Sequence, residues 1–174
     1  MFKNLNKNSP QEDLLYNNIL LLSRNKLFFT KFFLADSFQN RIYLIFMHIS
    51  FLFIKIKHEN QKKIYKIFYQ KMFDLIFSNI ELNMREIGYG DTIINKNMKF
   101  LVKNFYNILL YCENFSIKEL NSKKMFLSTY LKHNNMKKKA DNTSLIRYFD
   151  KYQAFCFDLS LDSVLKGDLN FRYK

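Results

Sequence analysis

Residues 38–57 read FQNRIYLIFMHISFLFIKIK, and this stretch decides the fold. Its apolar residues recur at steps of three or four, at positions 38, 42, 45, 49, 53 and 56, as the buried face of an α-helix requires. Further apolar residues on the flanks are typical of a helix at the centre of a bundle. The most hydrophobic part, residues 42–56, is shorter than the roughly 20 residues that span a bilayer, so we expect a buried helix.

Polar residues interrupt this helix at regular intervals. Arg41, His48 and Lys55 are seven residues apart and therefore share one stripe. That stripe is either an edge facing solvent or a polar seam facing a neighbouring helix or a partner. Asp36 or Ser37 is the expected N-cap residue before the helix.

The same periodicity extends to both sides of this helix. It predicts further helices at 11–23, 25–33, 61–87, 95–113, 116–133 and 143–161, the sixth helix opening with a Ser116–Glu119 capping box. The residues expected on the buried face of the helix at 61–87 are Ile64, Phe68, Met72, Leu75, Ile76 and Leu82. Three glycines and one proline are too few for the turns of a many-stranded β fold. The sequence predicts an all-α fold, a compact bundle of about six to seven helices.

The length of 174 residues indicates one domain. We expect a disordered leader at 1–10, a single helical domain at 11–174 and a linker containing three lysines at 134–142. The polar N-terminal residues contain no apolar core of a secretory signal. The expected location is therefore cytoplasmic, with peripheral contact at the inner face of the membrane as a further option.

A tight junction follows the predicted fourth helix. Gly88 suits the left-handed residue that ends a helix, and Gly90 and Asp91 lead into the next one. Glu81 and Arg85 are four residues apart and can pair across one helical turn. A Gly-x-Gly that follows a helix and lacks a subsequent Lys-Ser/Thr is not a phosphate-binding loop.

No catalytic or metal-binding pattern is present in the sequence. Cys112 and Cys156 are far apart, and the three histidines have no ligand spacing with each other or with cysteine. We therefore predict no metal, no cofactor, no catalytic residues and no small-molecule substrate, and hence a protein that is not an enzyme.

The formal net charge of +13 suggests an acidic partner, which would be RNA, an anionic membrane or an acidic protein. The abundance of Lys, Asn, Ile, Phe and Tyr also fits an AT-rich genome, which raises the lysine content without any role in binding. Aromatic residues alternate with lysines at 63–69, but the apolar members keep helical spacing, which favours an amphipathic helix over a nucleic-acid surface.

Short motifs occur in order along the chain: Asp36, Arg41 and His48; MREIGYGD at 84–91; Lys96 and Lys99; Phe105-Tyr106; and GDLNF at 167–171. Taken together, this series resembles the ubiquinol–cytochrome c chaperone family. The resemblance implies a non-enzymatic assembly factor that binds newly made cytochrome b, or another subunit of the cytochrome bc1 complex. Mitochondrial relatives act near the ribosome exit with a small partner protein.

The resemblance also singles out candidate partner-binding residues: Arg41, His48, Arg85, Glu86 and Asp91. We expect them to form one polar cluster between the third and fourth helices, near the Gly88–Gly90 turn, because polar groups on apolar helices are exposed or paired. Two alternatives stay open. One is a basic helical protein that associates with RNA or the ribosome; the other is a peripheral membrane protein that acts through an amphipathic helix.

Overall fold

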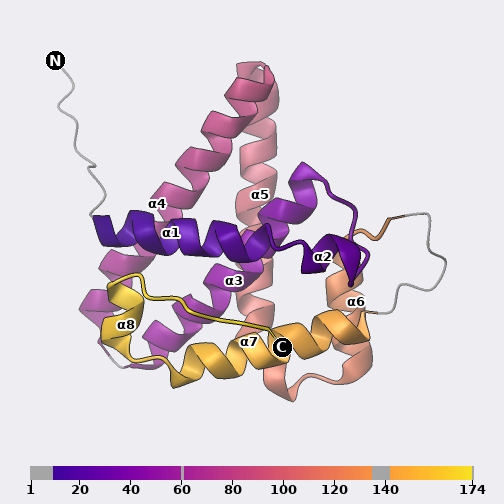
Figure 1. Ribbon diagram of the computed structural model, residues 1–174. Helices are drawn as coiled ribbons and strands as arrows, with labels where there is room; N and C mark the ends of the chain where they lie inside the picture. The colour runs from indigo at the N-terminus through magenta and orange to yellow at the C-terminus, as the bar shows by residue number, and fades with distance from the viewer. Residues whose placement is uncertain (1–9, 60, 135–141, 174) are drawn as a thin grey trace, which may run out of the picture.

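A computed structural model describes residues 10–59, 61–134 and 142–173, and these fold into a helical bundle (Figure 1). Their elements are α1 (Pro10–Ser23), α2 (Leu27–Thr30), α3 (Phe38–His58), α4 (Lys62–Ile87), α5 (Asp91–Cys112), the 3-10 helix η1 (Phe115–Ile117), α6 (Leu120–Tyr130), α7 (Thr143–Asp158) and α8 (Leu161–Leu165). The prediction of an all-α bundle is confirmed. The predicted leader and linker lie almost entirely outside the described residues.

Helix α3 is the centre of the bundle, as its sequence predicts. It packs against α1, α4, α5 and α7, and it is buried without interruption from Ile42 to Ile54. The Ser37 hydroxyl accepts a hydrogen bond from the Asn40 N–H at 3.2 Å, so Ser37 is the N-cap residue. No described helix is both long and apolar enough to cross a membrane.

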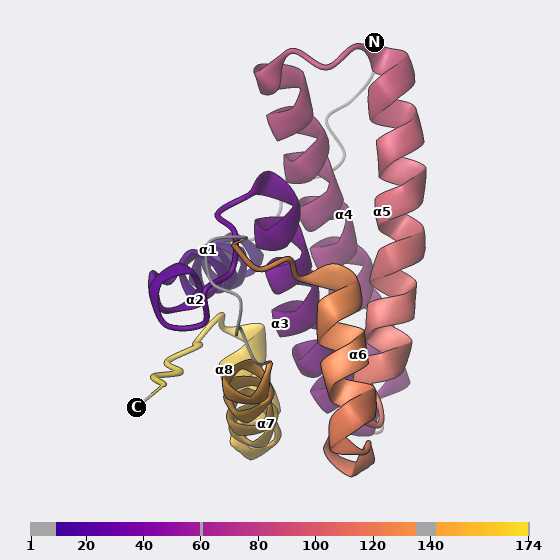
Figure 2. The same ribbon diagram turned by 90° about the vertical axis from the view of Figure 1, so that its right-hand side faces the viewer.

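Helices α4 and α5 form an antiparallel hairpin whose tip projects beyond the rest of the bundle (Figures 1 and 2). Gly88 ends α4 with φ of +96°, its N–H donates to the Arg85 carbonyl, and the Tyr89 N–H donates to the Met84 carbonyl. This pair of hydrogen bonds is the Schellman motif, and it confirms the predicted left-handed role of Gly88. Helix α5 begins at Asp91, before the predicted Asn95, because the Gly90 carbonyl already accepts helical hydrogen bonds.

Two predictions from sequence are wrong in detail. Ser116 does not cap α6: the chain forms η1 there, which buries the Phe115 ring against Phe51, and Glu119 becomes the N-cap residue without a side-chain hydrogen bond. Leu82 is 54% exposed. The buried face of α4 continues through Ile80 and Met84, so Leu82 lies on the other side of that helix.

The C-terminal segment lies across the bundle instead of extending into solvent (Figure 1). The ring of Phe171 packs against Tyr148 and Tyr152 of α7. Gly167 has φ of +82°, and a Cβ atom there would lie 2.8 Å from the Gln11 carbonyl oxygen of α1. Only glycine allows this close approach of the tail to α1.

Candidate functional site

A groove opens between the start of α3 and the α4–α5 hairpin. Its apolar part has a volume of about 330 Å³ and is bounded by Phe38, Ile42, Met84, Tyr89, Phe100 and Leu101. Ile42 and Met84 are buried, whereas the two aromatic residues of the hairpin, Tyr89 and Phe100, are 43% and 54% exposed. Large apolar side chains therefore line the groove and remain available to a binding partner.

A charged pocket of about 400 Å³ adjoins the apolar part, and Phe38 lines both. Its charged residues are Arg24, Asp36, Arg41 and Glu86. We call the two pockets together the hairpin groove. It offers a partner one apolar compartment and one compartment of mixed charge, both lined by Phe38.

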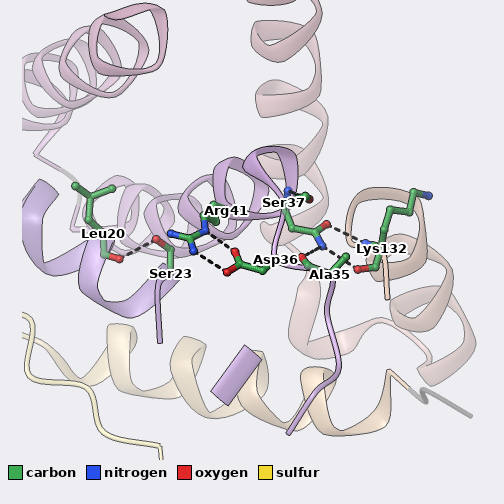
Figure 3. A network of polar contacts seen from close by, with 8 residues as sticks. Leu20, Ser23, Ala35, Asp36, Ser37, Arg41 and Lys132 are labelled. Carbon is green, nitrogen blue, oxygen red and sulfur yellow. Dashed lines mark hydrogen bonds and ion pairs between the residues drawn. The ribbon is translucent and has the colours of Figure 1, made fainter. Parts of the chain in front are cut away.

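The start of α3 is held rigidly at this groove by Asn40. The buried Asn40 amide donates to the Ala35 carbonyl at 2.7 Å and to the Lys132 carbonyl at 2.8 Å, and it accepts from the Lys132 N–H at 2.9 Å. Figure 3 shows these contacts beside the Asp36–Arg41 pair. A backbone bridge between Leu34 and His133 lies next to them. The segment before α3 is thus fastened to the end of α6.

Asp36 and Arg41 form a two-point ion pair on the wall of the charged pocket (Figure 3). Arg41 Nε and Nη2 lie 2.7 and 2.9 Å from the two carboxylate oxygens of Asp36. Hydrogen bonds from Arg41 lower the pKa of the Asp36 carboxyl, so the pair stays ionised at neutral pH. The Arg41 guanidinium also lies 5.5 Å from the centre of the Phe29 ring.

Arg85 is exposed near the tip of the hairpin, and its side chain links α4 to the start of α5. Its guanidinium contacts Asp91 at 2.6 Å and Glu81 at 2.9 Å, which confirms the predicted Glu81–Arg85 pair. The groups are exposed, so solvent screens both pairs and they contribute little to stability. Arg85 and Asp91 thus support the turn, while Glu86 lines the charged pocket with Arg41.

His48 is far from this groove. Its ring is fully buried against α7, with Nε2 2.8 Å from the Tyr148 hydroxyl and Nδ1 2.6 Å from the Leu44 carbonyl. The prediction of one polar cluster is therefore wrong: the five residues fall in three places. Two residues of the Arg41–His48–Lys55 stripe do form a polar seam against a neighbouring helix. His48 contacts Tyr148 of α7, and the Lys55 ammonium donates to the Phe157 carbonyl of the same helix.

Comparison with known proteins identifies the family. The family model for the ubiquinol–cytochrome C chaperone matches residues 30–171. The chain belongs to this chaperone family. No curated protein matches it. A crystal structure of the Cbp3 homolog from Brucella abortus superimposes with a TM-score of 0.75 at 21% sequence identity, covering 94% of this chain and 91% of that one. At this identity the likeness shows a shared fold.

Sequence reasoning missed several residues that shape the groove of this chaperone. Phe38 follows the inward spacing of α3, yet it is 37% exposed because it precedes the part of α3 that the bundle covers. Phe100 and Tyr89 belong to helical and turn patterns that do not distinguish a groove from a core. For Tyr89 the usable signal was its place within the GYGD turn, because a hairpin tip that projects cannot bury all of its apolar residues; Phe100, nine residues beyond Asp91, carries no such signal.

The chemistry of the described residues fits the chaperone family. They contain no group of three or more His, Cys, Asp or Glu side chains that could hold a metal ion. Cys112 and Cys156 are buried, and desolvation raises the pKa of both thiols, which keeps them protonated and unreactive. The hairpin groove can bind by apolar contact and hydrogen bonding.

Proposed function

We propose that this chaperone assists assembly of the cytochrome bc1 complex by binding newly made cytochrome b, or another bc1 subunit, in the hairpin groove, without catalysis. Family membership supports a role in assembly of the bc1 complex. The hairpin groove supports binding of a client without catalysis. The observation that carries the proposal is the pairing of an apolar pocket with a charged one across Phe38.

The groove suits a client that is still incompletely assembled. Such a protein exposes apolar side chains that water disfavours, and the apolar pocket can bury one of them between Tyr89 and Phe100. Burial of one large side chain contributes about 1.5–3 kcal/mol. This is less than the roughly 4 kcal/mol of a millimolar complex, so the buried side chain would act together with further contacts of the client.

The charged pocket would then set the orientation of the client. Asp36 and Arg41 form a half-exposed ion pair, whose charged groups can make further hydrogen bonds with polar groups of a client. Glu86 and Arg24 on the same wall provide one further charge of each sign. The predicted partner-binding roles of Arg41 and Glu86 belong to this proposal, whereas Arg85, Asp91 and His48 act through the fold.

Replacing the two aromatic residues of the groove tests the proposal. Tyr89→Ser with Phe100→Ser should reduce co-purification of cytochrome b roughly ten-fold, since each substitution removes apolar contact area. Assembled bc1 complex in the cells should fall in parallel. The matched control is Leu21→Ser with Ile117→Ser, which removes two exposed apolar side chains outside the groove.

Two results would contradict the proposal. One is wild-type capture of cytochrome b by the groove variant while it stays folded. The other is a normal level of bc1 complex and of ubiquinol oxidation in a strain that lacks the gene. In that second case a basic protein associated with RNA or the ribosome is the better account, and its binding should weaken steeply as salt is raised.

A further inference from the structure

Helix α5 carries lysines and apolar residues along one outward face. Lys96, Lys99 and Lys103 are all exposed. Ile93 and Leu110 are 51% and 68% exposed. Ile93 lies three residues before Lys96, and Lys96, Lys103 and Leu110 follow at steps of seven, so the two kinds of side chain share one stripe.

No acidic residue between the two ends of α5 offsets the positive charge of this face. The sequence has no Asp or Glu from residue 92 to residue 112. At the two ends of α5, Asp91 is paired with Arg85 and Glu113 with Lys57. Within the described part of the chain, the three lysines of α5 make no ion pair.

The position of α5 leaves this face open along its length. Figure 2 shows α5 at one edge of the molecule, with α4 on one side and α6 beside its lower half. The buried residues of α5 (Ile94, Leu101, Asn104, Phe105, Ile108 and Cys112) lie on the opposite side of the helix. With 22 residues, α5 is about 33 Å long, so a flat surface could meet it over several turns.

We propose that the outward face of α5 docks the protein on the surface of an anionic lipid bilayer. The lysines would contact acidic headgroups, and Ile93 and Leu110 would enter the boundary between headgroups and acyl chains. An RNA surface fits less well, because phosphates and bases offer no apolar phase for aliphatic side chains. Docking on a bilayer goes beyond the proposed function and does not rest on it, since it needs no client.

Vesicle co-sedimentation of the full-length purified protein tests this docking. The probes are vesicles of pure phosphatidylcholine and vesicles with about a third of phosphatidylglycerol, whose anionic surface attracts each nearby lysine. Wild-type protein should partition onto the anionic vesicles. Lys96→Gln with Lys99→Gln and Lys103→Gln should weaken that partition on the order of 100-fold, given about five-fold for each lysine.

A matched variant removes the same charge from the far side of the molecule. Lys26→Gln, Arg147→Gln and Arg172→Gln change exposed residues just before α2, in α7 and in the C-terminal segment, which Figure 2 shows on the side opposite α5. Its partition onto anionic vesicles should stay within about three-fold of wild type, because charges beyond a Debye length of about 10 Å contribute little. Circular dichroism checks that both variants are folded.

The apolar part of the contact is tested separately. Ile93→Asn with Leu110→Asn leaves every charge and the groove residue Phe100 in place, and it should also weaken partition at least ten-fold. Wild-type partition by either α5 variant overturns the proposal. So does equal loss in the far-side variant, or tight binding of a single-stranded RNA with no binding to anionic vesicles.

Discussion

At the scale of single residues, His48 illustrates how burial decides the state of a titratable group. A carbonyl oxygen only accepts, so Nδ1 carries the proton and donates to Leu44, and Nε2 accepts from the Tyr148 hydroxyl. The rings of Phe28 and Tyr152 pack edge-on against the imidazole. Desolvation in this aromatic cluster lowers the pKa of His48 from 6.5 to about 4.

The lowered pKa predicts a loss of stability in mild acid. As pH falls from 6.5 to 4, unfolded chains take up a proton at His48 and folded chains do not, so the free energy of unfolding decreases. Stability that is fully present above pH 6.5 is lost by up to about 3 kcal/mol over this window. Urea denaturation at pH 7 and at pH 4.5 measures the change.

A substitution isolates the contribution of His48 from that of the carboxylates. In His48→Gln the difference in stability between pH 7 and pH 4.5 should be smaller than in wild type by about 2 kcal/mol. His58→Gln, at an exposed position at the end of α3, should keep the wild-type difference. If the stability difference between pH 7 and pH 4.5 is unchanged in His48→Gln, His48 is already protonated in the folded protein at pH 4.5.

At the scale of elements, the α4–α5 hairpin depends on one backbone conformation. Gly88 has φ of +96°, and no atom would lie within 4 Å of an added Cβ, so the requirement for glycine there is conformational and not steric. Gly90, two residues later, has φ of −73°, which every L-residue adopts. The two glycines of the GYGD motif therefore have different roles.

The difference predicts unequal effects of the same substitution. Gly88→Ala should lower the free energy of unfolding by about 1–2 kcal/mol, the cost of a left-handed non-glycine residue. Gly90→Ala should change it by less than about 0.5 kcal/mol, because reduced freedom of the unfolded chain offsets weaker capping. Thermal unfolding of both variants measures the effects, and equal melting temperatures would argue against the left-handed conformation at Gly88.

At the scale of the whole molecule, the groove depends on contacts between segments about 90 residues apart. The side chain of Asn40 in α3 makes three hydrogen bonds, two of them to the Lys132 backbone that follows α6. Tyr111 of α5 stacks on Phe126 of α6 with ring centres 3.9 Å apart. These contacts hold the start of α3 opposite the hairpin.

Loss of the Asn40 side chain should therefore loosen the groove and the fold together. Asn40→Ala leaves buried carbonyl and N–H groups without partners, and we expect it to cost about 3 kcal/mol of unfolding free energy. The control, Asn79→Ala, removes a single bond to the Leu75 carbonyl of the same helix and should cost less than about 1 kcal/mol. Equal costs in urea denaturation would show that water replaces the Asn40 contacts.

The sequence by itself determined the helices, the helix end at Gly88 and the family motifs, because each of these rests on interactions within a few residues. It also located Arg41 and Glu86 of the candidate site through the motifs that carry them. Only the tertiary structure decided that Arg41 and Glu86 share a pocket while His48 is buried against α7. The physical reason is that periodicity defines the apolar face of a helix but not the helix that covers it. Where many aromatic faces could pair, close packing of the whole chain selects the partners and leaves Phe38, Tyr89 and Phe100 at the surface.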